Sequence, residues 1–184
     1  AINIFDKEGK RKDKDGKQGD IKAMGLDLKR ADTPKYVQDF LMGVLEMVIQ
    51  QGKGRDEVID KIKEFKRVLA AQEPWTKGSP KSVNNLTRHT ENWEKTGKCG
   101  VGHAMAAINW NRIKEAFGDR RSMDITDGQK AIVCKLRSNP MQINSIAYPI
   151  DEMNLPDWFK QLPFDHTAME ETIIDSKIEN LLGV

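Results

Sequence analysis

The chain has 184 residues, of which 38% are apolar and 32% are charged, and its 30 basic and 28 acidic side chains leave a net charge of +2. This length is sufficient for a buried core, since a domain of roughly 150 residues hides about two-thirds of its unfolded surface. No apolar run approaches the ~20 residues of a membrane-spanning helix, and we expect no signal peptide. The two cysteines, Cys99 and Cys134, form no disulfide pattern and indicate a reducing cytoplasm.

Charge is distributed unevenly along the chain. Residues 1–120 carry 24 basic and 18 acidic side chains, whereas residues 121–184 carry 6 and 10. An excess of positive charge in one part favours a polyanionic partner for that part, although ordinary solvated surface charge explains the same numbers.

The first predicted element is a β-hairpin, followed by a helix. Residues 2–5 and 20–25 have strand character, and the polar segment 7–18 between them is typical of a long turn. The helix is expected to start with Thr33 as N-cap and Pro34 in the first helical position. Its apolar stripe consists of Val37, Phe40, Leu41, Val44, Leu45 and Val48.

The remaining elements predict a fold that is α+β and mainly helical. A second helix over residues 55–72 forms an antiparallel hairpin with the first. Prolines and glycines interrupt residues 73–102, so we predict an irregular polar loop there. Further elements are a helix over 103–117, a small two-stranded element over 130–136 and 142–148, a short helix over 157–161 and a longer one over 165–182.

No pattern of catalytic or metal-binding residues stands out. The chain has two cysteines and three histidines, and they lack the paired spacing of a zinc site. We interpret the acidic pairs Asp124/Asp127 and Glu170/Glu171 as facing solvent. The sequence therefore predicts no catalytic residues and no metal ligands.

The strongest local signal is the mixture of basic, aromatic and amide side chains over residues 73–103. Basic groups neutralise phosphates, while Asn, His and Trp bond or stack with sugars and bases. This composition indicates nucleic-acid binding, with an ordinary polar loop as the alternative.

Short motifs along nearly the whole chain resemble family B DNA polymerases just beyond their catalytic palm, in particular the replicative polymerases of tailed phages. They are Ile4–Gly9, Ile21–Asp27, Thr33–Lys35, Ser82–His89, Lys98–Cys99 followed by His103, Asp127–Lys130, Leu136–Arg137, Asn139–Pro140 and Ile146–Pro149. None of them is diagnostic alone, and their order and spacing carry the resemblance.

This resemblance implies that residues 1–31 form the end of the palm as a β-ribbon and that residues 32–184 form the thumb, which holds primer–template duplex DNA through its backbone. The basic part would face the duplex and the acidic tail would face away. The DNA-binding residues that the resemblance implies are Lys22, Lys29, Arg30, Lys81, Asn84, Arg88, His89, Lys98 and His103.

The resemblance also implies what this chain lacks. The family's catalytic aspartates, nucleotide-binding helix and exonuclease acids, and with them its Mg²⁺, would lie upstream of Ala1. We therefore expect no cofactor in this chain and no polymerase activity of the chain alone, with the N-terminal remainder of the polymerase as a partner. The chain would be an excised fragment or the smaller half of a polymerase encoded in two pieces, in the cytoplasm of a bacterial or phage-infected cell.

Other interpretations stay open. The hairpin Thr33–Gln72 is also compatible with a stand-alone helical module that binds another protein, and a metal-dependent nuclease is a third possibility. Near the C-terminus, Ile178, Leu181 and Leu182 have the apolar spacing of a sliding-clamp-binding peptide but lack its Gln and aromatic pair. A packed amphipathic helix is the alternative for this segment.

Overall fold

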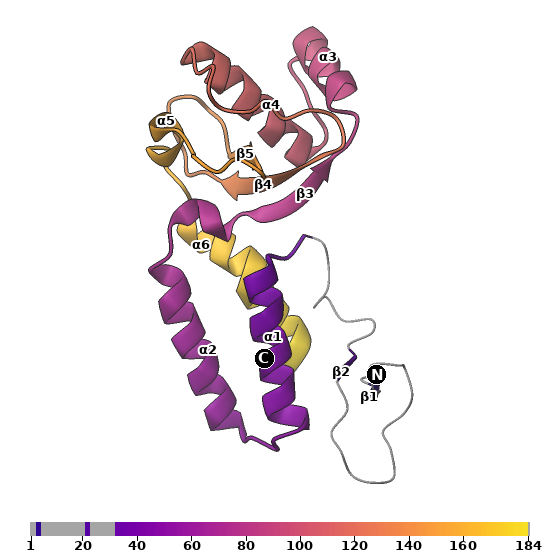
Figure 1. Cartoon of the computed structure of the whole chain (residues 1–184), viewed down its shortest axis with the longest axis vertical. Coiled ribbons are helices and arrows are strands. Elements are labelled where there is room, and N and C mark those ends of the chain that lie inside the picture. Colours follow the sequence, from indigo (N-terminus) through magenta and orange to yellow (C-terminus); the bar gives the residue numbers. More distant parts are fainter. Residues whose placement is uncertain (1–2, 5–20, 23–31, 184) are drawn as a thin grey trace. The chain divides into compact units, whose positions relative to one another are not determined.

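The computed structural model describes residues 3–4, 21–22 and 32–183, and these form an α+β, mainly helical fold, as predicted (Figure 1). The elements are β1 (Asn3–Ile4), β2 (Ile21–Lys22), α1 (Lys35–Ile49), α2 (Arg55–Ala70), the 3₁₀ turn η2 (Pro74–Lys77), β3 (Ser79–Val83), α3 (Leu86–Thr96), α4 (Gly102–Ala116), β4 (Gln129–Lys135), β5 (Ser145–Pro149), α5 (Asp157–Lys160), α6 (His166–Glu170), the π-helical turn η3 (Glu171–Asp175) and α7 (Ser176–Leu182).

The chain divides into two compact units. Unit 1 holds residues 1–71 and 174–184, and unit 2 holds residues 72–173. The expected boundary between residues 31 and 32 falls at the edge of the described residues and stays a prediction. In unit 1, the two strands β1 and β2 pair antiparallel, with Asn3 opposite Lys22.

Unit 1 contains the predicted helical hairpin. Phe40 near the start of α1 stacks on Phe65 near the end of α2, with ring centroids 3.8 Å apart, so the two helices run antiparallel. The predicted stripe of α1 is buried from Val37 to Leu45, which confirms the helical periodicity, but Val48 is 42% exposed. In α7, Ile178 is buried, so this short helix belongs to the apolar interior of the unit.

Helix α1 begins one residue later than predicted. Pro34 is the N-cap, with ψ at 142°, and Lys35 is the first helical residue. Because Pro34 itself has an extended ψ, the helix starts after it, and Thr33 lies one residue before the N-cap position. The Thr33 hydroxyl is buried without a partner, and its carbonyl accepts a hydrogen bond from Gln38 Nε2 at 2.9 Å.

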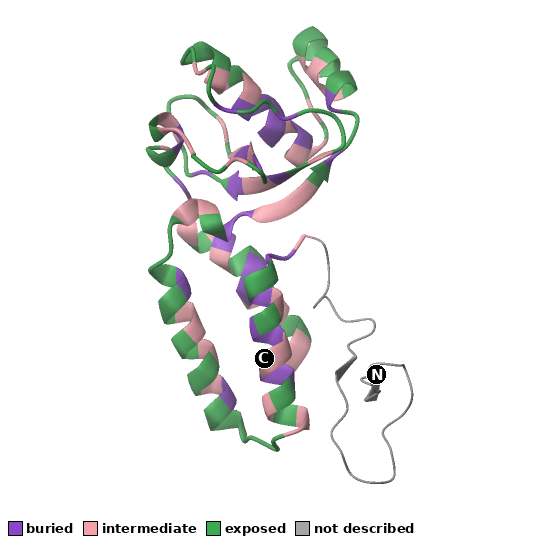
Figure 2. Cartoon of the chain, in the orientation of Figure 1, coloured by how far each residue is buried: buried purple, intermediate pink, exposed green. Residues whose placement is uncertain are grey.

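Unit 2 is built on a three-stranded antiparallel sheet with the order β3-β4-β5. Both predicted strands, β4 and β5, are present, and β3 adds a third whose Lys81 lies opposite Ala131. Helix α4 packs on the sheet, and its buried side, which includes Ala106, Ala107 and Trp110, faces the strands (Figure 2). Small alanine side chains allow the helix backbone to approach the sheet closely.

The segment 73–102 was predicted as an irregular loop, and this prediction is wrong. It holds η2, β3 and α3. Strand β3 contains Pro80, which cannot donate to a ladder, so the strand is tolerated at the edge of the sheet. Its pairing partner, β4, lies about fifty residues along the chain, and local patterns do not reveal such a pairing.

A buried charge fixes η2 to the C-terminal part of unit 2. Lys77 is completely buried, and its Nζ donates to Glu170 Oε1 at 2.7 Å and to His166 Nδ1 at 3.0 Å. Burial and the nearby charge of Lys77 lower the pKa of His166, which keeps this ring neutral and able to accept. The structure thus corrects the expectation that Glu170 faces solvent, because the carboxylate compensates a buried ammonium.

The close packing around Gly78 predicts that a larger residue at this position lowers the stability of the chain. A Cβ added at Gly78 would lie 2.5 Å from Ile132 Cγ2 and 2.9 Å from the Val133 carbonyl oxygen, whereas one added at Gly43 in α1 meets no described atom within 4 Å. We expect Gly78→Ala to lower the free energy of unfolding by about 1–3 kcal/mol through overpacking. Gly43→Ala should raise it by up to about 1 kcal/mol through helix propensity. Urea unfolding measures both, and equal effects of the two substitutions would contradict the close approach at Gly78.

Candidate nucleic-acid interface

Helix α3 begins with a cap that comes from far along the chain. Its N-cap residue, Asn85, has a left-handed backbone with φ at 56°, and its own side chain makes no capping hydrogen bond. Instead, the Asp127 carboxylate accepts from the Leu86 N–H and, at 3.0 Å, from the Thr87 hydroxyl. A carboxylate there satisfies a free N–H group and complements the positive end of the helix dipole. Asp127 is exposed, as the sequence indicated, and it also has a structural role as the cap of α3.

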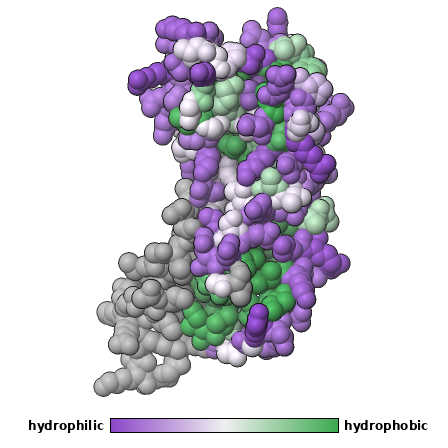
Figure 3. Space-filling model, turned by 180° about the vertical axis from the view of Figure 1, so that it is seen from behind, coloured by the Kyte–Doolittle hydropathy of each residue, from purple (hydrophilic) through white to green (hydrophobic). Residues whose placement is uncertain are grey.

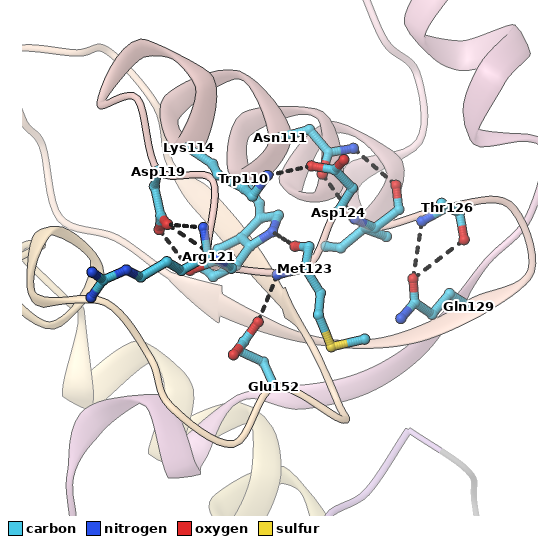
Figure 4. Close-up of polar contacts among 12 residues, drawn as sticks. Trp110, Asn111, Lys114, Asp119, Arg121, Met123, Asp124, Thr126, Gln129 and Glu152 are labelled. Carbon is cyan, nitrogen blue, oxygen red and sulfur yellow. Dashed lines mark hydrogen bonds and ion pairs between the residues drawn. The ribbon is translucent and has the colours of Figure 1, made fainter.

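The loop that brings Asp127 to α3 is held by side chains of α4 (Figure 4). Trp110 Nε1 donates to the Met123 carbonyl at 2.9 Å. Asn111 makes two hydrogen bonds of 2.9 Å with the backbone of Ile125, one through each atom of its amide. Glu152 accepts from the Met123 N–H at 2.8 Å. These bonds fix the path of the loop, and so they fix the place at which α3 starts.

Asp119 stabilises the first turn of the same loop. Burial alone would raise the pKa of this carboxyl, but hydrogen bonds from Ser122, Trp158 and the Arg121 N–H together hold it far below its usual range. The Trp158 Nε1 bond is 3.0 Å and the Ser122 hydroxyl bond is 2.6 Å. The carboxylate stays ionised at any pH near neutrality, and the turn is a rigid part of the scaffold.

Three of the predicted DNA-binding residues come together from three elements. Lys81 lies on β3, His89 on α3 and His103 in the first turn of α4. Burial lowers the pKa of His103, and the electrostatic influence of Lys81 and of His89 lowers it further. Helix α4 packs against both β3 and α3, the elements that carry Lys81 and His89. We refer to Lys81, His89 and His103 as the basic cluster.

The basic cluster lies near the N-terminal end of α4. Val101 is the N-cap of α4 and has no side chain able to cap, and the first turn of α4 holds no acidic residue. The N–H groups of this turn and the positive end of the helix dipole thus add to the charge of the cluster. Such an arrangement can bind an anionic oxygen such as that of a phosphate.

The other predicted residues are placed as follows. Asn84 and Arg88 are exposed near the start of α3, and Lys98 is exposed in the loop after it, where its carbonyl accepts from Asn92 Nδ2 at 3.0 Å. The predictions for Lys29 and Arg30 lie outside the described residues. For Lys22 the structure describes only a backbone position in β2.

The residues of the possible clamp-binding peptide lie in α7. Ile178 is buried, and Leu181 and Leu182 are half-buried. This burial favours the packed helix of the two alternatives, and clamp binding stays an untested prediction.

One aromatic–basic pair was not anticipated. The Arg112 guanidinium of α4 lies over the Trp93 ring of α3, 4.0 Å from its centroid. Trp93 belongs to the segment 73–103 on which the nucleic-acid signal rested, but Arg112 lies outside it. The two residues are nineteen positions apart on different helices, so only the packing of α3 on α4 brings them together.

The thiols show no sign of chemical reactivity. Both cysteines are unpaired, and burial raises the pKa of the Cys134 thiol far above its ordinary range. Within residues 3–4, 21–22 and 32–183, no three His, Cys, Asp or Glu side chains gather in the way a metal ion requires. In this same part of the chain, no helix combines the length and apolar character needed to cross a membrane.

Comparison with known proteins finds similarity to two phage enzymes. The chain is 26% identical over 150 residues to a DNA-directed DNA polymerase of Enterobacteria phage T4, and 27% identical over 155 residues to one of Escherichia phage RB69. Each alignment covers 81% of this chain, which spans 16% of the length of either relative. No protein-family model matches the chain. The similarity supports a relation to phage-type DNA polymerases, in agreement with the resemblance inferred from the motifs.

The distant cap of α3 leads to a testable prediction. Asp127→Ala removes the acceptor for the Leu86 N–H and should lower the free energy of unfolding by about 1–2 kcal/mol, as the loss of a helix cap does. Asp127→Asn keeps an acceptor oxygen and should lose less than half of that. Urea unfolding followed by circular dichroism measures both, and an alanine variant as stable as the unmodified chain would show that Asp127 does not cap α3.

Proposed function

We propose that this chain is part of a phage-type DNA polymerase of family B, and that unit 2 acts as a thumb that grips duplex primer–template DNA by its sugar–phosphate backbone. The observation that carries the proposal is the basic cluster at the start of α4. The similarity to two DNA polymerases supports DNA as the polyanion.

The two helix ends in this region differ in the charge that they present. The start of α3 carries the Asp127 carboxylate, which accepts from the Leu86 N–H and opposes the positive end of the helix dipole. The start of α4 has no acidic residue and lies beside Lys81 and His103. A DNA phosphate is therefore expected at α4 and not at α3.

Contacts of this kind hold DNA without reading its sequence. Phosphate contacts position a protein on the duplex, whereas base-edge contacts specify the sequence. Exposed Arg88 in the first turn of α3 and exposed Lys98 after its end would extend the backbone contact. A polymerase thumb must accept any sequence, and this set of residues fits that requirement.

Catalysis is not assigned to this chain. The catalytic aspartates of the family and their Mg²⁺ would come from an N-terminal remainder, which we propose as the partner of unit 1. Apolar side chains gather on the surface of unit 1 (Figure 3), and Tyr36, Val48 and Val68 of the helical hairpin are each more than a third exposed. An exposed apolar surface favours a protein contact. The same observation supports the second candidate function, a helical module that binds another protein.

We do not propose a sliding clamp as a partner of this chain. Binding through Ile178, Leu181 and Leu182 would require the buried Ile178 side chain to leave the interior of unit 1.

The salt dependence of duplex binding tests the proposed grip. Each phosphate contact contributes about 0.9 to the slope of log affinity against log salt concentration. Lys81→Gln and Arg88→Gln should each make the slope shallower by about 0.9, with an equal effect on duplexes of different sequence. Lys63→Gln, at an exposed position of α2, is the matched control and should leave the slope unchanged. Unchanged slopes for Lys81→Gln and Arg88→Gln, or strong sequence preference, would refute the grip.

The lowered pKa of His103 predicts a pH dependence of the same binding. Burial and the nearby Lys81 lower the pKa of His103, which favours the neutral imidazole in the free chain. A neighbouring DNA phosphate favours the protonated ring and raises its pKa, so the complex binds more protons than the free components. Affinity should therefore rise as the pH is lowered from about 8 to about 6. Fluorescence anisotropy with a labelled duplex measures the affinity at each pH. His103→Gln should make the affinity less dependent on pH. An affinity that does not change with pH in the unmodified chain would exclude His103 from the contact.

A further inference from the structure

Unit 2 contains a groove that the proposed duplex contact does not use. Its volume is about 640 Å³, and its lining comes from α3, α4 and the connection between β4 and β5. The lining residues that matter here are Trp93, Asn109, Arg112, Arg137, Met141 and Ile143. We propose that this groove takes one unpaired nucleotide of single-stranded DNA, an inference that rests on the proposed function because it assumes that unit 2 works on DNA.

The charged side chains that line the groove favour an anionic ligand. Among the described residues that line it, Arg112 and Arg137 are the charged ones, and both are positive. Arg112 is oriented by its position over the Trp93 ring, which leaves the edge of its planar guanidinium available for a phosphate. An oriented guanidinium loses less conformational freedom on binding than a flexible side chain does.

The buried side-chain amide of Asn109 has an oxygen that lacks a hydrogen-bond donor. Asn109 lines the groove and is 2% exposed, and its Nδ2 donates to the Ser145 carbonyl at 2.9 Å. This bond fixes which way the amide points, because the reverse orientation would set its oxygen against the carbonyl. Its Oδ1 has no hydrogen-bond partner in the structure. A buried acceptor without a partner is costly, and a ligand with an N–H group would remove that cost.

The remaining lining is apolar. Met141 and Ile143 come from the connection between β4 and β5, and Met141 is 43% exposed. Flexible methionine side chains adapt to flat apolar ligands and contact aromatic rings favourably. An inorganic phosphate would use only the two arginines and leave the apolar walls and the amide unused.

An unpaired nucleotide matches all three properties at once. It has a phosphate for Arg112 and Arg137, a flat base for the apolar walls and a base N–H for Asn109. Bases in a duplex are stacked and paired, so the ligand must be single-stranded. An acidic peptide also combines negative charge with N–H groups. The presence of the basic cluster in the same unit favours DNA, because the proposed duplex contact already brings nucleic acid to this unit.

The test compares two fluorescently labelled single strands of equal length and charge, one with ordinary bases and one with abasic sugars. Base stacking contributes an amount that corresponds to a roughly fivefold or larger difference in affinity. We expect the unmodified chain to bind the strand with bases at least about fivefold more tightly. Arg112→Gln removes a phosphate contact and should weaken binding of both strands, whereas Arg120→Gln, at an exposed arginine outside the groove, should leave the affinities unchanged.

Several outcomes separate this proposal from the duplex grip. If Lys81→Gln weakens duplex binding and Arg112→Gln does not, the two sites are distinct and the proposal stands. Equal affinity for the ordinary and the abasic strand would overturn it and leave the duplex grip untouched. Displacement of the strand by a glutamate-rich peptide at lower concentration than by a free single strand would also overturn it in favour of a peptide site. Should Arg112→Gln fail to fold by circular dichroism, Arg137→Gln repeats the test from the opposite wall.

Discussion

The capping of α3 by Asp127 is the interaction on which the arrangement of unit 2 depends. A left-handed residue at the N-cap position prevents local capping, so the helix takes its cap from a loop about forty residues further on. That loop keeps its path because Trp110 and Asn111 bind its backbone from α4. Asp127 thereby couples α3 to α4, and this coupling brings His89 to His103 and Trp93 to Arg112.

The starts of α3 and α4, which this coupling links, differ in their electrostatic properties. Asp127 caps the start of α3, whereas the first turn of α4 holds no acidic residue and lies near Lys81. Exposed cations on their own contribute little and are screened by salt. Backbone N–H groups and a helix dipole add a fixed contribution that needs no side chain to be ordered. We propose that this combination lets a small unit hold DNA of any sequence.

Local patterns in the sequence predicted the parts of the fold that local forces decide. The apolar stripe of α1 identified its buried side, and the strand character of residues 130–136 and 142–148 identified β4 and β5. Strand β3 and helix α3 were missed, because a strand containing Pro80 forms only through its pairing with β4 and a helix after Asn85 only through a distant cap. The basic and aromatic segment is predicted to bind nucleic acid, but only tertiary packing shows that Arg112 lies beside its Trp93.

Amide chemical shifts of the ¹⁵N-labelled chain, recorded during titration with a short duplex, test the central claim most directly. The account predicts that the largest changes fall on Gly102, His103 and Ala104, because the N–H groups of the first turn of α4 would meet a phosphate. The amides of Leu86 and Thr87 should change little, since Asp127 already neutralises the start of α3. Largest changes at Leu86 and Thr87, or changes confined to unit 1, would contradict the account.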